Sequence, residues 1–310
     1  GRPVAVVEAK RESVDPLSAK GQARAYAASL GVSHIFRSNG LVHYYWNLRQ
    51  GNPVKVSRLL PLEELGKTAE WRPDPQRLAS VAVDENYIAV SQDAAWPGYA
   101  SAERSEIAVN KKIRLLRDYQ LEAIRALQQA GLPGRHRFLF EMATGTGKTL
   151  LSAAVAKLYL RTENATRVLF LVDRLELENQ AVKNFRLYLA NDGIETVIYK
   201  HTRSNWRNAQ VVVTTIQSLA AQNRFLTEFA PTDFQLIISD EAHRTISGNN
   251  RAIFEYFVGV KLGLTATPRD YLKGVGDEER ANDPTAYERR LLLDTYRTFG
   301  SDDGVPTFRY

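Results

Sequence analysis

The chain has 310 residues, of which 44% are hydrophobic and 25% charged, and it contains no cysteine. This composition is typical of a globular protein long enough for two compact domains, and it excludes disordered and collagen-like chains, disulfide scaffolds, thiolate zinc sites and iron–sulfur clusters. The formal net charge of +6 fits a polyanionic partner, although solubility alone would also explain such a surplus.

The apolar runs are all short, and no secretory signal opens the chain. We therefore expect a soluble, cytoplasmic protein without membrane-spanning segments. The single methionine, Met142, is internal and the chain begins at Gly1, so we expect the sequence to be a piece of a longer protein.

Residues 1–65 are predicted to form a small α/β or α+β unit. An apolar strand pattern covers 3–10, and a helical pattern follows over 17–30. Two further strand-like runs, 33–37 and 41–47, flank Ser38-Asn39-Gly40, which is a strong hairpin signal. Residues 66–110 lack sustained periodicity, so we interpret them as a connecting region without assigned structure.

In this first unit, two pairs of polar residues are spaced so that both side chains of a pair lie on one face of their strand or helix. Glu8 and Lys10 are two apart on a strand and so point to the same face, where a carboxylate and a lysine can hold Mg²⁺, orient a water and stabilise charge on a phosphate. Gln22 and Tyr26 are four apart and share one helix face. Taken alone, an exposed ion pair at a strand end and a capped, half-buried helix face are the better explanations of these residues.

Residues 111–310 alternate between strand and helix patterns. This alternation predicts a parallel sheet covered by helices on both faces. The predicted strands are 137–141, 167–172, 196–199, 210–215, 234–238 and 260–265.

A glycine-rich loop over 141–149 separates the first of these strands from a helix expected near Leu150. Backbone N–H groups of such a loop converge on phosphate oxygens, Lys148 can reach the β- and γ-phosphates, and the Thr149 hydroxyl can bind Mg²⁺. Met142 stands where the first glycine of this motif is usual; the alternative is a turn that only connects strand and helix. The nucleotide-binding candidates are Thr144, Gly145, Thr146, Gly147, Lys148 and Thr149.

The second acidic motif is Asp240-Glu-Ala-His243, which directly follows a buried-type strand. Asp240 can hold Mg²⁺ and Glu241 can polarise the attacking water. Together with the glycine-rich loop, this motif predicts an ATPase.

The spacing of these motifs resembles superfamily 2 helicases and translocases of the Asp-Glu-Ala-His type over about 115–270. The resemblance implies that Gln120 reads adenine, that Thr265 and Thr267 link nucleotide state to nucleic-acid grip, and that His243 couples the lobes. It also implies DNA-backbone contacts for three residues that a solvated loop would explain equally well: Arg174, Thr214 and Thr215.

A second RecA-like lobe supplies arginines in that family. Only about forty residues follow Pro268, too few for another lobe, so we expect these 310 residues alone to hydrolyse ATP poorly.

The strand with Glu8 and Lys10, followed by the helix with Gln22 and Tyr26, resembles PD-(D/E)xK nucleases of the RecB-like branch. The resemblance implies that these four residues are catalytic and that Glu8 binds Mg²⁺. Those nucleases also need an Asp on the preceding strand, which this chain lacks. We expect that Asp upstream in the parent protein and little DNA cleavage without it.

Both parts together resemble the restriction (R) subunit of type I restriction–modification enzymes, with further similarity over 8–12, 36–40 and 288–294. Residues 306–310 resemble the passage towards the second lobe. The resemblance implies a small PD-(D/E)xK nuclease-like α/β domain (1–65), the connecting region (66–110) and one RecA-like doubly wound parallel-sheet lobe (111–310), with the second lobe absent. It implies an ATP- and Mg²⁺-dependent motor that translocates and cuts double-stranded DNA, with modification (methyltransferase) and specificity subunits as partners.

Three alternatives share parts of this pattern. An ATP-dependent RNA helicase would have the same ATPase motifs without a nuclease segment. A type III subunit or a solitary nuclease–helicase would lack the type I partners. A degenerate nuclease fold would serve only as a docking platform. Other residues with possible chemistry are interpreted as structural, since they lack metal-ligand spacing or favour packing: His34, His43, His136, His201 and Trp206.

Overall fold

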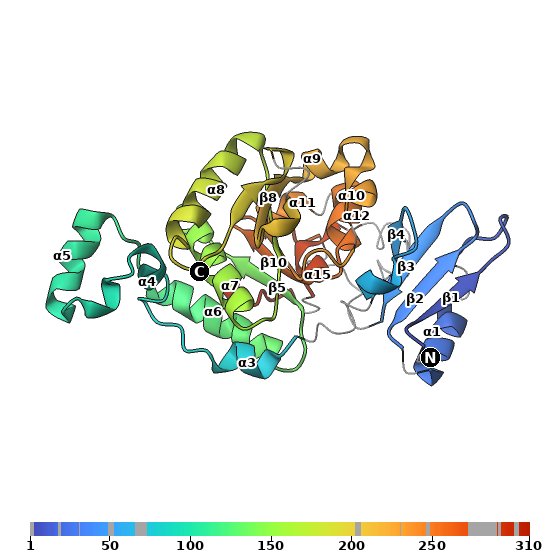
Figure 1. Cartoon of the computed structure of the whole chain (residues 1–310), viewed down its shortest axis with the longest axis horizontal. Helices are drawn as coiled ribbons and strands as arrows, with labels where there is room; N and C mark the ends of the chain where they lie inside the picture. The colour runs from blue at the N-terminus through green and yellow to red at the C-terminus, as the bar shows by residue number, and fades with distance from the viewer. Residues whose placement is uncertain are drawn as a thin grey trace.

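The computed structural model describes residues 3–17, 20–30, 32–48, 53–65, 73–201, 206–229, 231–245, 249–271, 290, 293–300 and 304–310. These residues form a four-stranded sheet and a seven-stranded sheet, each with its own helices (Figure 1). The predicted α/β class is confirmed, and the larger body has the parallel-sheet RecA-like core expected of residues 111–310.

The small sheet has the strand order β1-β2-β3-β4, in which β1 and β2 are parallel and the other two pairs are antiparallel. The predicted hairpin is present between β2 and β3, where Gly40 adopts a φ of 90° and the Asn39 side-chain oxygen accepts the N–H groups of Leu41 and Val42. The elements are β1 (Ala5–Ala9), α1 (Lys20–Ser29), β2 (His34–Ser38), β3 (His43–Asn47) and β4 (Val54–Val56).

The two faces of the small sheet are covered differently. On one face, Ala23 and Ala27 of α1 pack against Ile35 and Trp46, with Val6 at the edge of the cluster. Apolar residues of the opposite face, including Phe36, Tyr45 and Val54, join a cluster that extends into the larger body. Apolar burial therefore holds the small sheet against its neighbour on one side and against α1 on the other.

Residues 73–116 are more ordered than the connecting region that the sequence suggested. Helix α3 is capped by Asp74, whose carboxylate accepts the Arg77 N–H, and its Leu78 lies in the core of the larger body. Trp96, Ala108 and Ile113 form a separate small core beneath a helix that projects away from the large sheet (Figure 1). The elements are α3 (Pro75–Ser80), α4 (Ala89–Gln92), the 3-10 turn η1 (Trp96–Gly98) and α5 (Ser101–Lys111). Short helices of four to six residues show no full amphipathic period, which is why the pattern missed α3 and α4.

The large sheet has the order β11-β5-β10-β9-β6-β8-β7, and every pairing in it is parallel. All six predicted strands are present, because fully buried strands read as continuous apolar runs. The strands are β5 (Arg137–Glu141), β6 (Val168–Val172), β7 (Thr196–Ile198), β8 (Val211–Thr215), β9 (Leu236–Asp240), β10 (Val260–Thr265) and β11 (Phe308–Arg309).

Helices cover both faces of this sheet, as the alternation predicted. Phe138 and Phe140 point into the cluster formed with α6, α7 and α8, whereas Leu139 between them points into the cluster on the opposite face. Residues 306–310, which resemble a passage towards another lobe, place β11 beside β5. The helices are α6 (Asp118–Gly131), α7 (Lys148–Arg161), α8 (Leu175–Tyr188), α9 (Ile216–Ala220), α10 (Arg224–Thr227), α11 (Ala242–Thr245), α12 (Asn249–Tyr256) and α15 (Thr295–Thr298), with 3-10 turns η2 (Tyr199–His201), η3 (Trp206–Asn208) and η4 (Ala221–Asn223).

A buried charged cluster lies at the amino ends of β5 and β10. Arg137 donates to both carboxylate oxygens of Glu255 at 2.9 and 2.5 Å, and the Lys261 amino group donates to the Phe257 carbonyl at 2.7 Å. Burial alone would raise the pKa of Glu255, but hydrogen bonds from Arg137 and the nearby positive charges lower it to about 2. Burial, reinforced by the charge of Arg137, lowers the pKa of Lys261 to about 7.

Lys261 therefore makes stability depend on pH. Between about pH 7 and pH 10 the unfolded chain binds a proton at this lysine that the folded chain does not, so stability rises with pH. We predict that the free energy of unfolding of the wild type increases relative to Lys261→Met by up to about 1.4 kcal/mol per pH unit. Urea unfolding at pH 7 and pH 9 measures this difference. Lys183→Met removes an exposed lysine and serves as the control; an equal pH response in both variants would contradict the prediction.

Candidate nucleotide-binding and nuclease sites

The glycine-rich loop connects β5 to α7 at the carboxyl edge of the large sheet. Gly145 and Gly147 adopt φ values of 79° and 78°, which only glycine reaches without strain. Helix α7 begins at Lys148, two residues before the predicted start near Leu150. Lys148 and Thr149 therefore lie in the first turn of a helix, where the backbone N–H groups and the helix dipole favour an anion.

Gln120 and Tyr119 at the start of α6 form hydrogen bonds with the backbone of this loop. The Gln120 amide nitrogen donates to the carbonyls of Thr146 and Gly147 at 3.1 and 3.2 Å, and its oxygen accepts the Arg117 N–H at 3.0 Å. The Tyr119 hydroxyl donates to the Thr146 carbonyl at 2.8 Å. The Gln120 amide is thus engaged by protein, so contact with adenine stays a prediction and would require exchange of a partner. Sequence reasoning missed Tyr119, because no local pattern marks this contact.

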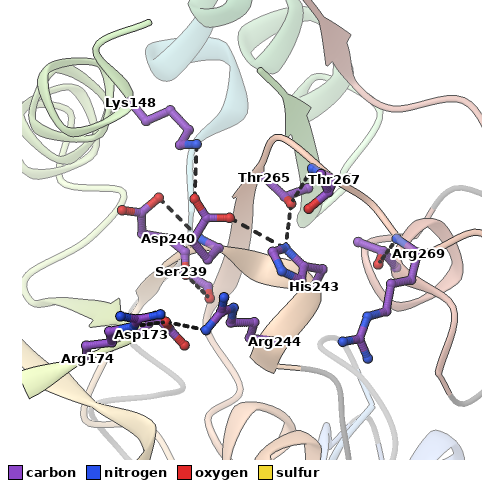
Figure 2. Close-up of polar contacts among 12 residues, drawn as sticks. Lys148, Asp173, Arg174, Ser239, Asp240, His243, Arg244, Thr265, Thr267 and Arg269 are labelled. Atoms are coloured by element: carbon purple, nitrogen blue, oxygen red, sulfur yellow. Dashed lines mark hydrogen bonds and ion pairs between the residues drawn. The ribbon is translucent and has the colours of Figure 1, made fainter. Parts of the chain in front are cut away.

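Asp240 ends β9, and Glu241 follows it with a φ of 52°, a left-handed conformation that is rare outside glycine. This conformation turns the Glu241 carboxylate towards the glycine-rich loop, where Oε1 lies 3.2 Å from the Lys148 amino group (Figure 2). The two motifs that the sequence paired are therefore in direct contact.

The Asp240 carboxylate is suited to a cation. Burial raises its pKa, and the positive charge of Lys148 opposes that effect. The Glu241 N–H donates to one oxygen at 3.1 Å, and within the part of the chain that the structure describes no cationic side chain forms an ion pair with Asp240. A partly buried carboxylate that no described cationic side chain pairs with, together with the Thr149 hydroxyl in the first turn of α7, fits the oxygen ligands that Mg²⁺ prefers.

His243 and Thr265 connect the acidic motif to the end of β10. The His243 Nδ1 atom lies 2.8 Å from the Thr265 hydroxyl and 3.5 Å from Glu241 Oε2, and the Thr267 N–H donates to the same hydroxyl at 3.1 Å (Figure 2). The Thr265 carbonyl accepts the Met142 N–H at 2.8 Å. Burial lowers the pKa of His243. Thr265 therefore contacts two other predicted motifs, the acidic motif and the glycine-rich loop, while Thr267 contributes its backbone to this network.

The three predicted DNA-binding residues have different surroundings. The Arg174 side chain is exposed at the end of β6, beside Asp173, which also forms an ion pair with Arg244 of α11 at 2.7 Å (Figure 2). Thr214 and Thr215 are fully buried, and the Thr215 hydroxyl caps α9 by accepting the Ser218 N–H. The side chains of Thr214 and Thr215 therefore have no exposed surface in this conformation, and their contact with DNA stays a prediction.

Glu8 and Lys10 lie together on the small sheet, as their spacing predicted. The Lys10 amino group is 2.7 Å from Glu8 Oε1, and the Nε of Arg37 donates to Glu8 Oε2 at 2.8 Å. Tyr26 is exposed on α1, and Gln22 lies in α1 with its side chain outside the described part of the structure. Sequence reasoning missed Arg37, although the strand register places it directly opposite Glu8.

The described residues of this second site do not hold a divalent metal by themselves. Both oxygens of Glu8 already have cationic partners, Lys10 and Arg37. No group of three or more His, Cys, Asp or Glu side chains suited to a metal occurs among the described residues. The assignment of Mg²⁺ to Glu8 stays a prediction that needs at least one further carboxylate.

Several residues interpreted as structural have packing or hydrogen-bonding roles. Trp206 is fully buried against Phe229 and Phe234. His34 and His43 hydrogen-bond to neighbouring strand residues, and His136 to a backbone carbonyl; the side chain of His201 lies outside the described part. In the portion of the chain that is described, no helix is long and apolar enough to cross a membrane.

Comparison with known proteins adds three findings. A family model described as "Type III restriction enzyme, res subunit" matches residues 114–270. The endonuclease subunit of the Escherichia coli type I restriction enzyme EcoAI is 26% identical over 279 residues, which cover 87% of this chain and 32% of that subunit. The endonuclease subunit of the type I enzyme SauMSSORF170P from Staphylococcus aureus is 26% identical over 299 residues, which cover 87% and 29%.

A solved fragment assigned to the HsdR subunit of a type I restriction enzyme from Vibrio vulnificus YJ016 is 25% identical, with a TM-score of 0.40 over 99% of this chain and 47% of that one. The resemblance to type I R subunits inferred from the sequence motifs is confirmed by the two sequence relatives over most of the chain. The chain spans about 30% of the length of these two subunits.

The contact between Gly147 and Gln120 can be tested by adding one methyl group. A Cβ at Gly147 would lie 2.8 Å from the Gln120 amide nitrogen, in addition to the strain of a positive φ. We predict that Gly147→Ala weakens binding of a fluorescent ATP analogue at least about tenfold, or about 1.4 kcal/mol. Gly134→Ala carries the same backbone strain with no atom within 4 Å and should bind normally. Unchanged affinity in Gly147→Ala would show that the loop does not depend on this contact.

Proposed function

Because the chain belongs to the family described as the res subunit of type III restriction enzymes, and its relatives over most of its length are type I endonuclease subunits, we propose that it acts as the motor-nuclease subunit of a type I restriction enzyme. In this proposal, ATP hydrolysis at the large sheet drives translocation of double-stranded DNA, and a phosphodiester is cut at the small sheet. One observation carries the proposal: a Lys148–Glu241 pair at a phosphate-binding loop and a Glu8–Lys10 pair on a separate sheet occur in the same chain.

The residues of the first site have separate roles in ATP hydrolysis. Lys148 exchanges Glu241 for the β- and γ-phosphates when ATP enters, because a polyphosphate carries more negative charge than one carboxylate. Glu241, freed from that ion pair, then accepts a hydrogen bond from the attacking water and orients it. Mg²⁺ held by Thr149 and Asp240 would neutralise phosphate charge.

Coupling of hydrolysis to DNA movement is proposed for the hydrogen-bonded path through His243. This histidine contacts both the catalytic carboxylate of Glu241 and the hydroxyl of Thr265, and the backbone of Thr267 is bonded to that hydroxyl. A change of partner at Glu241 therefore alters the position of the segment after β10. The exposed Arg174 remains the candidate for contact with the DNA backbone.

At the second site, Lys10 is the residue proposed to face the scissile phosphate. Its side chain is partly exposed, and its amino group can stabilise charge that develops on the phosphate oxygens. Gln22 and Tyr26 on α1 are proposed to contribute from the helix side. A metal at this site would require a carboxylate in addition to Glu8, so the proposed roles belong to the side chains of Glu8, Lys10, Gln22 and Tyr26 alone.

The proposal includes modification and specificity subunits as partners, since the sequence relatives are named as subunits of type I enzymes. A type III subunit or a solitary nuclease–helicase is the second candidate, because the matching family model is described by a type III subunit and covers only residues 114–270. Purification of the tagged protein from its host distinguishes the candidates. Co-purifying modification and specificity subunits support type I, and a modification subunit alone supports type III.

Two substitutions separate the motor from the nuclease. In the assembled complex, Lys148→Ala should abolish ATP turnover and, with it, cleavage that depends on translocation. Glu8→Ala should lower cleavage at least about 100-fold while ATP turnover stimulated by duplex DNA persists. Glu12→Ala, an exposed acid in the same segment, is the control.

These variants also test the alternatives. If the Glu8→Ala variant still cleaves DNA, the small sheet is a docking platform and not a nuclease. Stimulation of ATP turnover by RNA but not by duplex DNA would instead identify an RNA helicase.

A further inference from the structure

Arg37 is the most completely buried charged residue of the small sheet, and its side chain has no exposed surface. It lies on β2, one strand away from Glu8, and the parallel register of β1 and β2 places the two residues opposite each other. A guanidinium is costly to bury unless an anion accepts its hydrogen bonds. The Glu8 carboxylate is the anion that compensates this charge.

The position of Arg37 on the sheet connects the site to the core beneath α1. Two residues earlier on each strand, Val6 and Ile35 belong to the cluster that Ala23 and Ala27 of α1 cover. Because side chains two apart on a strand share a face, Glu8 and Arg37 lie on the same face as α1. The arginine thus lies between a packed apolar core and the candidate carboxylate.

Arg37 and Lys10 each contact a different oxygen of the Glu8 carboxylate. Arg37 Nε donates to Oε2 at 2.8 Å, while the Lys10 amino group lies 2.7 Å from Oε1. Their exposure differs: the Lys10 side chain is 22% exposed and Arg37 is 0% exposed. Lys10 can therefore reach a substrate, whereas the fully buried Arg37 can influence a substrate through the carboxylate that it holds.

We propose that Arg37 is a positioning residue of the candidate nuclease site, which fixes the Glu8 side chain so that Oε1 and the Lys10 amino group face the substrate together. This inference rests on the proposed nuclease function of the small sheet. The planar guanidinium is suited to this role because its N–H groups are rigidly directed, whereas a lysine would offer a mobile point charge. Holding the carboxylate before the substrate arrives lowers the entropy lost on reaching the reactive geometry.

The test uses Arg37→Met and Arg37→Lys in the assembled complex, with Arg24→Met as a control that removes an exposed arginine of the same domain. We expect Arg37→Met to lower the rate of DNA cleavage between about 10-fold and 100-fold. Arg37→Lys should recover part of this loss, since it restores a cationic donor. ATP turnover stimulated by duplex DNA, measured on the same samples, should equal the wild type in all three variants.

A double-substitution cycle shows whether Arg37 acts through Glu8. Glu8→Asp keeps a carboxylate but shortens the side chain by one methylene, so it withdraws from the Arg37 Nε. We expect Arg37→Met to lower cleavage by less than about threefold in the Glu8→Asp background, because coupled residues are non-additive. The same non-additivity should appear in the thermal unfolding midpoints, a readout that does not require cleavage.

The outcomes separate this inference from the function on which it rests. Full cleavage by Glu8→Ala would refute the nuclease function itself. Loss of cleavage in Glu8→Ala with wild-type cleavage in Arg37→Met would overturn the role of Arg37 alone. Equal losses of cleavage and ATP turnover in Arg37→Met, or equal effects of Arg37→Met with Glu8 and with Asp at position 8, would show a general structural role instead. Should Arg37→Met fail to fold, Arg37→Lys decides: cleavage and ATP turnover both like the wild type would overturn the proposal.

Discussion

Burial of a parallel sheet on both faces is the constraint on which the larger body depends. Its central strands are buried along almost their whole length and are mostly apolar, because neither face of the sheet meets water. Polar side chains with chemistry are consequently restricted to the ends of strands and the loops beyond them. Since the strands are parallel, Asp240, Thr265 and the glycine-rich loop after Glu141 all emerge at the same edge.

The nucleotide-binding candidates are linked by contacts between these strand ends rather than by any one motif. Lys148 contacts Glu241, His243 lies between Glu241 and Thr265, and the Thr265 carbonyl accepts the N–H of Met142. Because Met142 and Lys148 both belong to the glycine-rich loop, these contacts form a closed ring. In such a closed arrangement, a ligand that replaces one partner changes the interactions of the others, which is the physical requirement for coupling between ATP and a second ligand.

The small sheet is attached to the larger body through apolar contacts. Phe36, Tyr45 and Val54 belong to the same cluster as Phe254 of α12, and β4 contacts α12 directly. The Ser57 hydroxyl also donates to the Leu226 carbonyl in α10. Glu8 and Arg37 lie on the opposite face of the small sheet, beside α1, so the candidate nuclease residues are directed away from this packed boundary.

The sequence by itself predicted most elements of both sheets and the candidate residues of the nucleotide site, because apolar periodicity and the glycine-rich loop are local signals. It missed β4 and β11, which are only three and two residues long. It placed six of the seven strands of the large sheet within two residues and brought Glu8 and Lys10 to one face, since strand alternation needs no knowledge of neighbours. Only the tertiary structure decided which side chains those residues meet. Arg37 and Tyr119 gain their roles from strand register and helix docking, and Thr214 and Thr215 are buried by the helix that follows them. Contacts between residues far apart in the chain depend on how the elements pack, and no short pattern of residues encodes that packing.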